Sequence, residues 1–476
     1  MTQLVAPSAE IIDAAGGDRL RGTGLAAALA PILRAYDALP PGVVVVRAAT
    51  TVSSVLRYLA AMAARRPVLL LDPGLPAAVV VTLVERYQPA AMVGLEQGPH
   101  LYGCVHPAGY GAGQRPGLGE VWLRGVSAGP APHPDLAVLL ATSGSTGSPK
   151  LVRLSRDAVL ANAKSIVEAL GIDDRDVAVT SLPLFYSYGL SVLNSHLMAG
   201  GRVVVAAGGV FSSDLWQACR SHGVTSLAGV PRHYEMLARI RWSPASVPTL
   251  RQLTQAGGRM RPELALHLAR QITACGGGLS VMYGQTEATA RMTVLPSHRL
   301  VEKVGSVGLP VPGGSLCVRS RDDATSCAPH VTGEVVYSGP NVMLGYSDDA
   351  SDLARGDQLG GVLATGDIGS LDSEGFLFLT GRTKRIAKIF GVRIDLDNLE
   401  QIAGTRAGTV AAVGTDDSAV IWWPGATDEA AADLARTLAD QLQVHRSGLQ
   451  VRGIDELPTL PNGKTDYRRL TEEATR

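Results

Sequence analysis

A run of apolar residues leads directly into a loop rich in glycine and hydroxyl groups, and this junction limits what the chain can fold into. The run is Leu136–Leu140, and the loop is Thr142-Ser143-Gly144-Ser145-Thr146-Gly147-Ser148-Pro149-Lys150. The apolar run predicts a buried strand, while the glycines let backbone N–H groups approach phosphate oxygens closely and Lys150 adds a positive charge. We therefore predict a phosphate loop, although a polar surface turn has the same composition. The spacing excludes a Walker loop, which needs Gly-x-x-x-x-Gly-Lys followed by Ser or Thr.

Strand-like and helix-like segments alternate on both sides of this junction. Apolar runs predict strands at 43–46, 66–71 and 202–205, and helical spacing predicts helices at 77–87 and around 234–240. This alternation predicts a layered α/β domain with parallel strands. A Gly/Pro-rich stretch at 107–134 interrupts it, and we predict that this stretch is a surface connection.

From residue 304 the chain changes character. Short strands separated by glycine and proline are predicted at 315–318, 333–337 and 375–379, which indicates a small β-rich subdomain. With 476 residues the chain is too long for one ordinary core. We predict an α/β fold with two domains. Residues 1–383 form a large N-terminal domain of layered α/β subdomains plus the β-rich part, and 384–476 form a small, mobile α+β C-terminal domain.

Charge and composition narrow the partners. Lys+Arg and Asp+Glu are both 43, so the formal net charge of zero gives no sign of a nucleic-acid or anionic-membrane surface. The N-terminus lacks a signal-peptide pattern, and no apolar run is long enough to cross a bilayer. The five cysteines are scattered without a Cys-x-x-Cys pair, which favours reduced thiols. We expect a cytoplasmic protein with no nucleic-acid or membrane partner.

Three further motifs follow along the chain: Tyr283-Gly284-Gln285-Thr286-Glu287, Thr365-Gly366-Asp367 with Gly381-Arg382, and Leu460-Pro461-Asn462-Gly463-Lys464. In the first, tyrosine can stack on a purine, threonine can contact phosphate, and glutamate can hold Mg²⁺. In the second, aspartate can accept two hydrogen bonds from ribose hydroxyls. In the third, the Asn-Gly turn presents a lysine at a loop tip. Each motif alone also fits an ordinary turn or a solvated charge, but their fixed order favours one nucleotide site.

Together these motifs resemble the adenylate-forming superfamily of acyl-CoA synthetases, peptide-synthetase adenylation domains and luciferases. The resemblance runs from Leu71-Asp72-Pro73 to the Lys464 loop, and includes Ala256-Gly257-Gly258, Gly333-Glu334, Gly339-Pro340 and Gly345-Tyr346. Two positions depart from the usual pattern: Leu151 replaces a glycine, and Lys384 stands at the hinge where many relatives have Asp. The resemblance implies a stand-alone AMP-dependent ligase. Such an enzyme joins ATP and a carboxylate into an acyl-adenylate, and the thiol of CoA or of a carrier protein's phosphopantetheine then takes the acyl group.

The resemblance also implies roles for individual residues. For ATP these are Thr142, Ser143, Gly144, Ser145, Thr146, Gly147, Lys150, Gly257, Gly258, Tyr283, Gly284, Asp367 and Arg382. For the acyl pocket they are Phe185, Tyr186, Ser187, Tyr188, Gly189, Pro231, Tyr234, Ala256, Gly258 and Gln285. Lys464, Thr286 and Glu287 are implied as catalytic residues, with Mg²⁺ at Glu287. The hinge and the thiol-step loop are implied at Lys384, Lys388, Gly391 and Arg393, so that rotation about the hinge exchanges the Lys464 loop for the Gly391 loop.

The residue after Phe185 bears on the substrate. Amino-acid-activating relatives usually have Asp there, and many fatty-acyl and aryl ligases have His, whereas this chain has Tyr186. We therefore expect a small aryl or short acyl acid rather than an α-amino acid. One alternative is a relative in natural-product biosynthesis that adenylates nitrite and diazotises an aromatic amine. A second is a catalytically inactive nucleotide-binding homologue, which is disfavoured because Thr146, Glu287, Asp367, Arg382 and Lys464 are all present.

Overall fold

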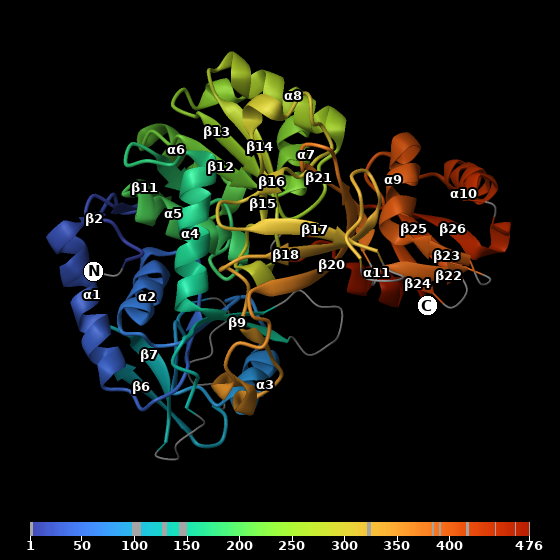
Figure 1. Ribbon diagram of the computed structural model, residues 1–476. Helices are drawn as coiled ribbons and strands as arrows, with labels where there is room; N and C mark the ends of the chain where they lie inside the picture. Colours follow the sequence, from blue (N-terminus) through green and yellow to red (C-terminus); the bar gives the residue numbers. More distant parts are fainter. Residues whose placement is uncertain are drawn as a thin grey trace. The chain divides into compact units, whose positions relative to one another are not determined.

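A computed structural model describes residues 3–97, 106–125, 131–141, 150–320, 325–382, 385–389, 392–415, 418–442, 444–461 and 463–475 (Figure 1). The chain divides into two units. Unit 1 comprises Met1–Ser315 and Ser338–Leu363, and unit 2 comprises Leu316–Tyr337 and Ala364–Arg476. The β-rich segment therefore groups with the C-terminal residues. The domain boundary expected between residues 383 and 384 lies outside the described residues and stays a prediction.

One sheet of unit 1 contains β8, the strand that precedes the predicted phosphate loop in the sequence. Its strands follow the order β19-β9-β8-β4-β3-β5-β7-β6. Their bounds are β3 (Val44–Arg47), β4 (Val68–Leu71), β5 (Ala91–Val93), β6 (Tyr110–Arg115), β7 (Gly119–Arg124), β8 (Leu136–Ala141), β9 (Leu151–Ser155) and β19 (Gly345–Ser347). β3 runs parallel to β4 and β5, and β4 runs parallel to β8. These parallel strands are buried, as continuous Val/Leu runs predict.

The prediction for residues 107–134 was wrong in part, because β6 and β7 form a hairpin that extends this sheet. Met92 on β5 pairs with Trp122 on β7, and β7 pairs with β6 along its whole length. The Trp122 side chain is fully buried beside Met92 and Tyr110. The glycines at 111 and 113 have weak strand propensity, so the sequence did not predict a hairpin here. Burial of the Trp122 indole outweighs that weak propensity.

A second sheet of unit 1 has the order β16-β15-β14-β13-β12-β10-β11-β1-β2. Its strands are β1 (Glu10–Asp13), β2 (Arg19–Arg21), β10 (Val177–Val179), β11 (Arg202–Val205), β12 (Ser226–Gly229), β13 (Gln252–Gln255), β14 (Gly278–Tyr283), β15 (Thr293–Leu295) and β16 (Leu309–Pro310). The helices of unit 1 are α1 (Gly22–Asp37), α2 (Val52–Ala63), α3 (Ala77–Tyr87), α4 (Arg156–Leu170), α5 (Ser187–Ala199), α6 (Ser213–Ser221), α7 (Pro231–Arg239) and α8 (Pro262–Ala274). The helix at 77–87 is found with the predicted bounds.

The register of the second sheet positions the site. β12, β13 and β14 run parallel, and Gly229 pairs with Gln255, which in turn pairs with Val281. The chain segments that leave the carboxyl ends of these strands therefore emerge along one edge of the sheet. In open α/β sheets, ligands bind at this edge. The segments that follow these strands hold half of the residues predicted for the acyl pocket: Pro231, Tyr234, Ala256, Gly258 and Gln285.

Unit 2 contains the β-rich segment and the C-terminal residues. One sheet has the order β17-β18-β20-β21, a second pairs β22 with β23, and a third has the order β24-β25-β26. The strands are β17 (Ser315–Arg319), β18 (Gly333–Ser338), β20 (Val362–Leu371), β21 (Leu377–Arg382), β22 (Ile386–Ile389), β23 (Val392–Asp395), β24 (Ala411–Thr415), β25 (Ser418–Pro424) and β26 (Leu449–Ile454). The helices are α9 (Leu396–Ala407), α10 (Asp428–Leu442) and α11 (Tyr467–Ala474). Within the described ranges of both units, no helix is long and apolar enough to cross a membrane.

Candidate functional site

The end of β14 brings a predicted catalytic residue to the predicted acyl pocket. Tyr283 is the last residue of the strand, and Thr286 begins a 3₁₀ helix, η3 (Thr286–Ala288). Gly284 between them is required by space, because a Cβ atom there would collide with the backbone carbonyl of Ala290. The hydroxyl of Thr286 lies 3.2 Å from the hydroxyl of Ser187 at the start of α5. A residue predicted to contact phosphate thus meets a residue predicted to line the acyl pocket.

Glu287 is held by both its main chain and its side chain. Its carbonyl accepts a hydrogen bond from the backbone N–H of Met343 at 2.8 Å, and its carboxylate accepts one from the Tyr346 hydroxyl, also at 2.8 Å. Partial burial and the adjacent carboxylate raise the pKa of Tyr346, so this phenol stays protonated as a donor. Carboxylate oxygens are the ligands that Mg²⁺ prefers in proteins, so the chemistry of Glu287 fits the predicted metal.

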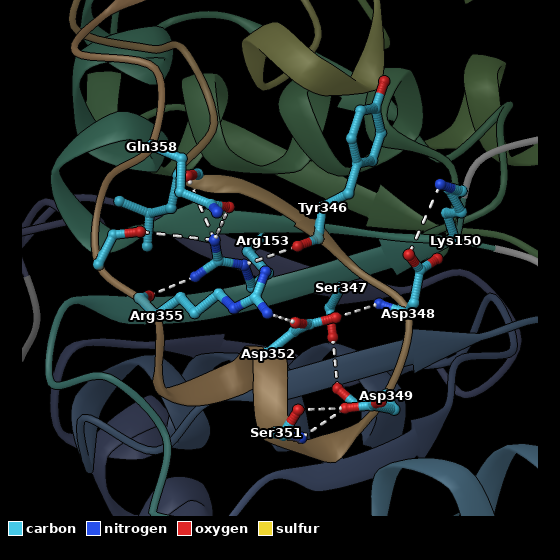
Figure 2. A network of polar contacts seen from close by, with 12 residues as sticks. Lys150, Arg153, Tyr346, Ser347, Asp348, Asp349, Ser351, Asp352, Arg355 and Gln358 are labelled. Atoms are coloured by element: carbon cyan, nitrogen blue, oxygen red, sulfur yellow. Dashed lines mark hydrogen bonds and ion pairs between the residues drawn. The ribbon is translucent and has the colours of Figure 1, made fainter.

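A polar network on β19 and the chain after it positions Tyr346 (Figure 2). The buried Arg153 of β9 donates hydrogen bonds to the backbone carbonyl of Tyr346 at 3.1 Å and to the side-chain oxygen of Gln358 at 2.6 Å. Lys150, the last residue of the predicted phosphate loop, forms an ion pair with Asp348 at 3.6 Å, and both side chains are largely exposed. An exposed ion pair of this kind is weak.

The two deepest tyrosines of the predicted acyl pocket bond to the same carbonyl. The hydroxyl of Tyr188 donates to the backbone oxygen of Thr254 at 2.9 Å, and that of Tyr234 donates to it at 2.8 Å. Burial raises the pKa of both phenols. These hydroxyls fix α5 and α7 to β13 rather than project toward a ligand. The ring of Tyr186 stands edge-on to Tyr188, with 6.2 Å between the centroids.

Tyr186 limits the space beside β13. Gly257 adopts a φ of 83°, which favours glycine, and a Cβ atom at this position would collide with the Tyr186 hydroxyl. Gly258 is held by its carbonyl, which accepts a hydrogen bond of 2.7 Å from the side-chain amide of Gln255. The other predicted pocket residues follow nearby elements: Phe185 precedes α5, Gly189 lies in α5, Pro231 begins α7, Ala256 follows β13 and Gln285 follows β14.

The predicted ribose residues meet on paired strands of unit 2. Asp367 on β20 pairs with Arg382 on β21, and the Arg382 Nε donates to the Asp367 carboxylate at 2.9 Å. The aspartate side chain is 8% exposed and the arginine side chain is 60% exposed. The carboxylate is therefore fixed by a group that still reaches solvent.

Lys464 lies in a tight loop of unit 2. The backbone N–H of Leu460 donates to the Lys464 carbonyl at 2.7 Å, and Thr459 pairs with Thr465 across the loop. Lys388 and Arg393 are partners in the β22–β23 register. Thr142, Ser143, Gly144, Ser145, Thr146, Gly147, Lys384 and Gly391 lie outside the described residues. Their predicted roles stay predictions, as do the roles of the other site residues.

The match to a known protein family decides the class of enzyme. Residues 24–347, more than half of the chain, match the AMP-binding enzyme family. The chain belongs to this family. The predicted membership of the adenylate-forming superfamily is thereby confirmed, and with it the predicted class of AMP-forming ligase.

Individual relatives of the family agree with this assignment. The chain is 31% identical over 350 residues to an indoleacetate–CoA ligase of Aromatoleum aromaticum, a match that covers 70% of this chain and 67% of that protein. It is 34% identical over 251 residues to a 2-succinylbenzoate–CoA ligase of Bacillus velezensis, covering 52% and 49% respectively. The matches thus span between about half and two thirds of these curated relatives. A solved o-succinylbenzoate CoA synthetase of Bacillus subtilis, in complex with its acyl-adenylate, has a TM-score of 0.75 at 21% identity, covering 97% of this chain and 94% of that chain. This similarity confirms the predicted α/β fold of the AMP-binding enzyme.

Sequence reasoning missed two residues that the structure brings into this region. Tyr346 was identified only as part of the Gly345-Tyr346 motif. The motif does not indicate that the Tyr346 hydroxyl bonds to Glu287, 59 residues earlier in the chain. Arg291 was not considered, although it lies beside the predicted pocket and is 2% exposed. The available signal was a charged residue between Ala290 and the mostly apolar stretch Met292–Leu295.

Proposed function

We propose that this chain activates a small carboxylic acid, aryl or short acyl, with ATP and passes the acyl group to the thiol of CoA. The observation that carries the proposal is the 3.2 Å approach of the Thr286 and Ser187 hydroxyls. Adenylation requires a carboxylate to reach the α-phosphate, so a phosphate-contacting residue and an acyl-pocket residue must be neighbours. The relatives, which are named as CoA ligases of aromatic acids, support the aryl class and CoA as acceptor.

In the first step, a carboxylate oxygen attacks the α-phosphorus of ATP. A new P–O bond forms, the bond to the pyrophosphate oxygen breaks, and acyl-adenylate and pyrophosphate result. We assign to Lys464 the stabilisation of the negative charge that develops between carboxylate and α-phosphate. Asp367 would bind the ribose hydroxyls, with its carboxylate oriented by Arg382. Mg²⁺ bound at Glu287 would neutralise phosphate charge and make pyrophosphate a better leaving group.

In the second step, the thiolate sulfur attacks the acyl carbonyl carbon and AMP leaves with the electron pair of the broken C–O bond. The thiol proton passes to solvent. We propose that the two steps use two orientations of the C-terminal domain, residues 384–476, which turns about Lys384. The first orientation would deliver Lys464, and the second would deliver the loop of Lys388, Gly391 and Arg393. Residues 142–147 would hold the β- and γ-phosphates through backbone N–H groups.

Carboxylate-dependent exchange of labelled pyrophosphate into ATP tests the first step across a panel of aryl and short acyl acids. We expect exchange with a subset of small acids and none without acid. A thioester with CoA then tests the second step, and a thioester only with a phosphopantetheinylated carrier protein would replace CoA by that partner. AMP release that depends on nitrite and an arylamine, with no acid needed, would overturn the proposal in favour of diazotisation. No nucleotide turnover with any substrate would indicate an inactive homologue.

A further inference from the structure

Arg291 is a buried cation that contacts a residue predicted to line the acyl pocket. Its side chain is almost wholly enclosed at 2% exposure. The guanidinium carbon lies 3.9 Å from the centre of the Tyr188 ring, in a cation–π contact. Its Nε approaches the sulfur of Met282 at 3.3 Å, and its charge acts on the phenol of Tyr186. The guanidinium of Arg291 therefore lies between α5 and the end of β14, beside two tyrosines predicted to line the acyl pocket.

Nothing among the described residues balances this charge. Arg291 forms no ion pair with a described carboxylate, and the groups that act on it electrostatically are the phenols of Tyr188 and Tyr186. Its Nη1 is buried without a hydrogen-bond partner in the described part of the chain. Burial lowers the pKa of Arg291, but a guanidinium keeps its proton at neutral pH. A buried charge without a counter-ion is strongly unfavourable, so its retention calls for an anion that the chain itself does not supply.

The backbone just before Arg291 is strained. Thr289 and Ala290 adopt φ values of 57° and 114°, a region that side chains other than glycine rarely occupy. The side-chain amide of Asn341 donates to the carbonyls of Ala288 and Arg291, at 2.8 and 2.9 Å. The amide of Asn162 on α4 donates to the same Arg291 carbonyl at 2.9 Å. The hydrogen bonds from Asn341 and Asn162 thus stabilise the strained turn. Backbone strain that is stabilised in this way is typical of functional sites.

We propose that Arg291 is a specificity-determining residue that binds a second, non-reacting carboxylate of the substrate, so that the acid activated is a short dicarboxylic acid. This rests on the proposed function, since one carboxylate must still react with ATP. A guanidinium forms two parallel hydrogen bonds with a carboxylate, which suits the planar group at the far end of such an acid. The Tyr186 hydroxyl occupies the space beside Gly257, which favours a short spacer between the two carboxylates.

The test compares diacids with their own monomethyl esters in the pyrophosphate-exchange assay. Succinate, glutarate and phthalate are each paired with the monoester, which removes one negative charge at nearly constant shape. Wild-type protein is expected to prefer the diacid by about 100-fold in kcat/KM, because the lost pair is buried. In Arg291→Gln the preference disappears, mainly through an increase in KM, because the group lies away from the reacting atoms. Arg270→Gln, at an exposed position of α8, is the matched control and keeps the preference.

Binding without turnover gives a second readout. A diacid without ATP should raise the thermal unfolding temperature of wild-type protein and of Arg270→Gln but not of Arg291→Gln. Arg291→Met tests a purely packing role. If this variant is more stable and keeps the wild-type choice of substrate, Arg291 only fills space against Tyr188 and the inference is overturned.

The outcomes separate the inference from the function on which it rests. Exchange with monocarboxylates and monoesters at rates equal to those of diacids, unchanged in Arg291→Gln, overturns the inference and leaves acid activation standing. No exchange with any carboxylate, together with AMP release that depends on nitrite, overturns both. A diacid preference that Arg291→Gln removes while monoester exchange survives supports both.

Discussion

The hydroxyl of Tyr346 donates a hydrogen bond of 2.8 Å to the carboxylate of Glu287 and so joins β19 to η3. Strand β19 is itself fixed, because Arg153 on the neighbouring β9 donates to the Tyr346 carbonyl. This hydrogen bond limits the rotation of the carboxylate. The orientation of Glu287 is therefore fixed, as its proposed role as a Mg²⁺ ligand requires.

We expect Tyr346→Phe to raise the Mg²⁺ concentration needed for half-maximal pyrophosphate exchange by about 10-fold. The variant keeps the ring and removes only the donor, so Glu287 gains freedom that metal binding must then restrict. The measurement is the Mg²⁺ dependence of exchange at saturating ATP and acid. Tyr110→Phe is the matched control, because it also removes one phenol donor. The hydroxyl of Tyr110, on β6, donates to the Pro89 carbonyl at 2.7 Å. An unchanged Mg²⁺ dependence in Tyr346→Phe would contradict the positioning role.

Lys464→Ala is expected to slow adenylate formation by about 10²–10³-fold. Thiol transfer from preformed acyl-adenylate should fall far less, because the lysine is proposed to act only in the first step. Both half-reactions are measured by rapid quench. Arg468→Ala removes a cation from α11 that pairs with Glu472 at 3.7 Å on the surface, and it should leave both rates near wild type. Equal loss of the two half-reactions in Lys464→Ala would refute domain alternation.

Local patterns in the sequence predicted the elements of the fold well. The Val/Leu runs of β3, β4, β8 and β11 appear as buried strands, and the helix at 77–87 has the predicted bounds. The strand predictions were correct because burial on both faces of a strand requires a continuous run of apolar residues in the sequence. The β6–β7 hairpin was not predicted, because its stability comes from Trp122. The partner of Trp122, Met92, lies thirty residues earlier in the chain and cannot be inferred from local composition.

The site was predictable as a set of motifs but not as a set of contacts. Asp367 and Arg382 were expected to serve one ribose, and their ion pair follows from strand register, which the sequence did not reveal. The tyrosines at 188 and 234 were predicted to line the acyl pocket, yet both hydroxyls bond to the backbone oxygen of Thr254. Such pairings depend on tertiary packing between elements far apart in the chain, and composition alone does not encode them.

The unfolding free energy is expected to fall as the pH drops from about 6.5 to about 4, in part because of His233. Burial lowers the pKa of this imidazole to about 4, below the value of roughly 6.5 in an unfolded chain. The unfolded state therefore binds the proton first, and stability present above pH 6.5 is lost on acidification, by at most about 3 kcal/mol. Buried His196, whose pKa is also lowered by burial, acts in the same direction.

Urea unfolding between pH 4.5 and 7.5 measures this dependence. His233→Leu should show a smaller loss of unfolding free energy over that range than wild type, because the variant has no proton to bind at this position. Comparing the two proteins removes the contribution of carboxylates common to both. His267→Leu, at an exposed position of α8, is the matched control. Parallel pH curves for wild type and His233→Leu would show that burial of this histidine does not contribute.

Arg385 is the centre of a partly buried charge cluster in unit 2. It bonds to Asp397 and, at 2.8 Å, to Glu400, and it stacks on the ring of Tyr467 at 3.9 Å. The Tyr467 hydroxyl also approaches Glu400, at 3.2 Å. Burial raises the pKa of Glu400 even though Arg385 opposes this effect. Because Arg385 follows the predicted hinge residue directly and Tyr467 begins α11 just after Lys464, the cluster ties these two segments together.

Arg385→Met is expected to destabilise unit 2 by about 3–5 kcal/mol, since it leaves Glu400 and Asp397 partly buried without their cation. Hydrogen exchange of the α9 and α11 amides measures the loss within this unit. Arg436→Met on α10 is the matched control, because its pair with Asp433 is exposed and worth at most about 1 kcal/mol. Adding Glu400→Leu to Arg385→Met should recover part of the protection, since the main uncompensated carboxylate is then removed. Protection in Arg385→Met equal to that in Arg436→Met would mean that the cluster contributes no more than a surface ion pair.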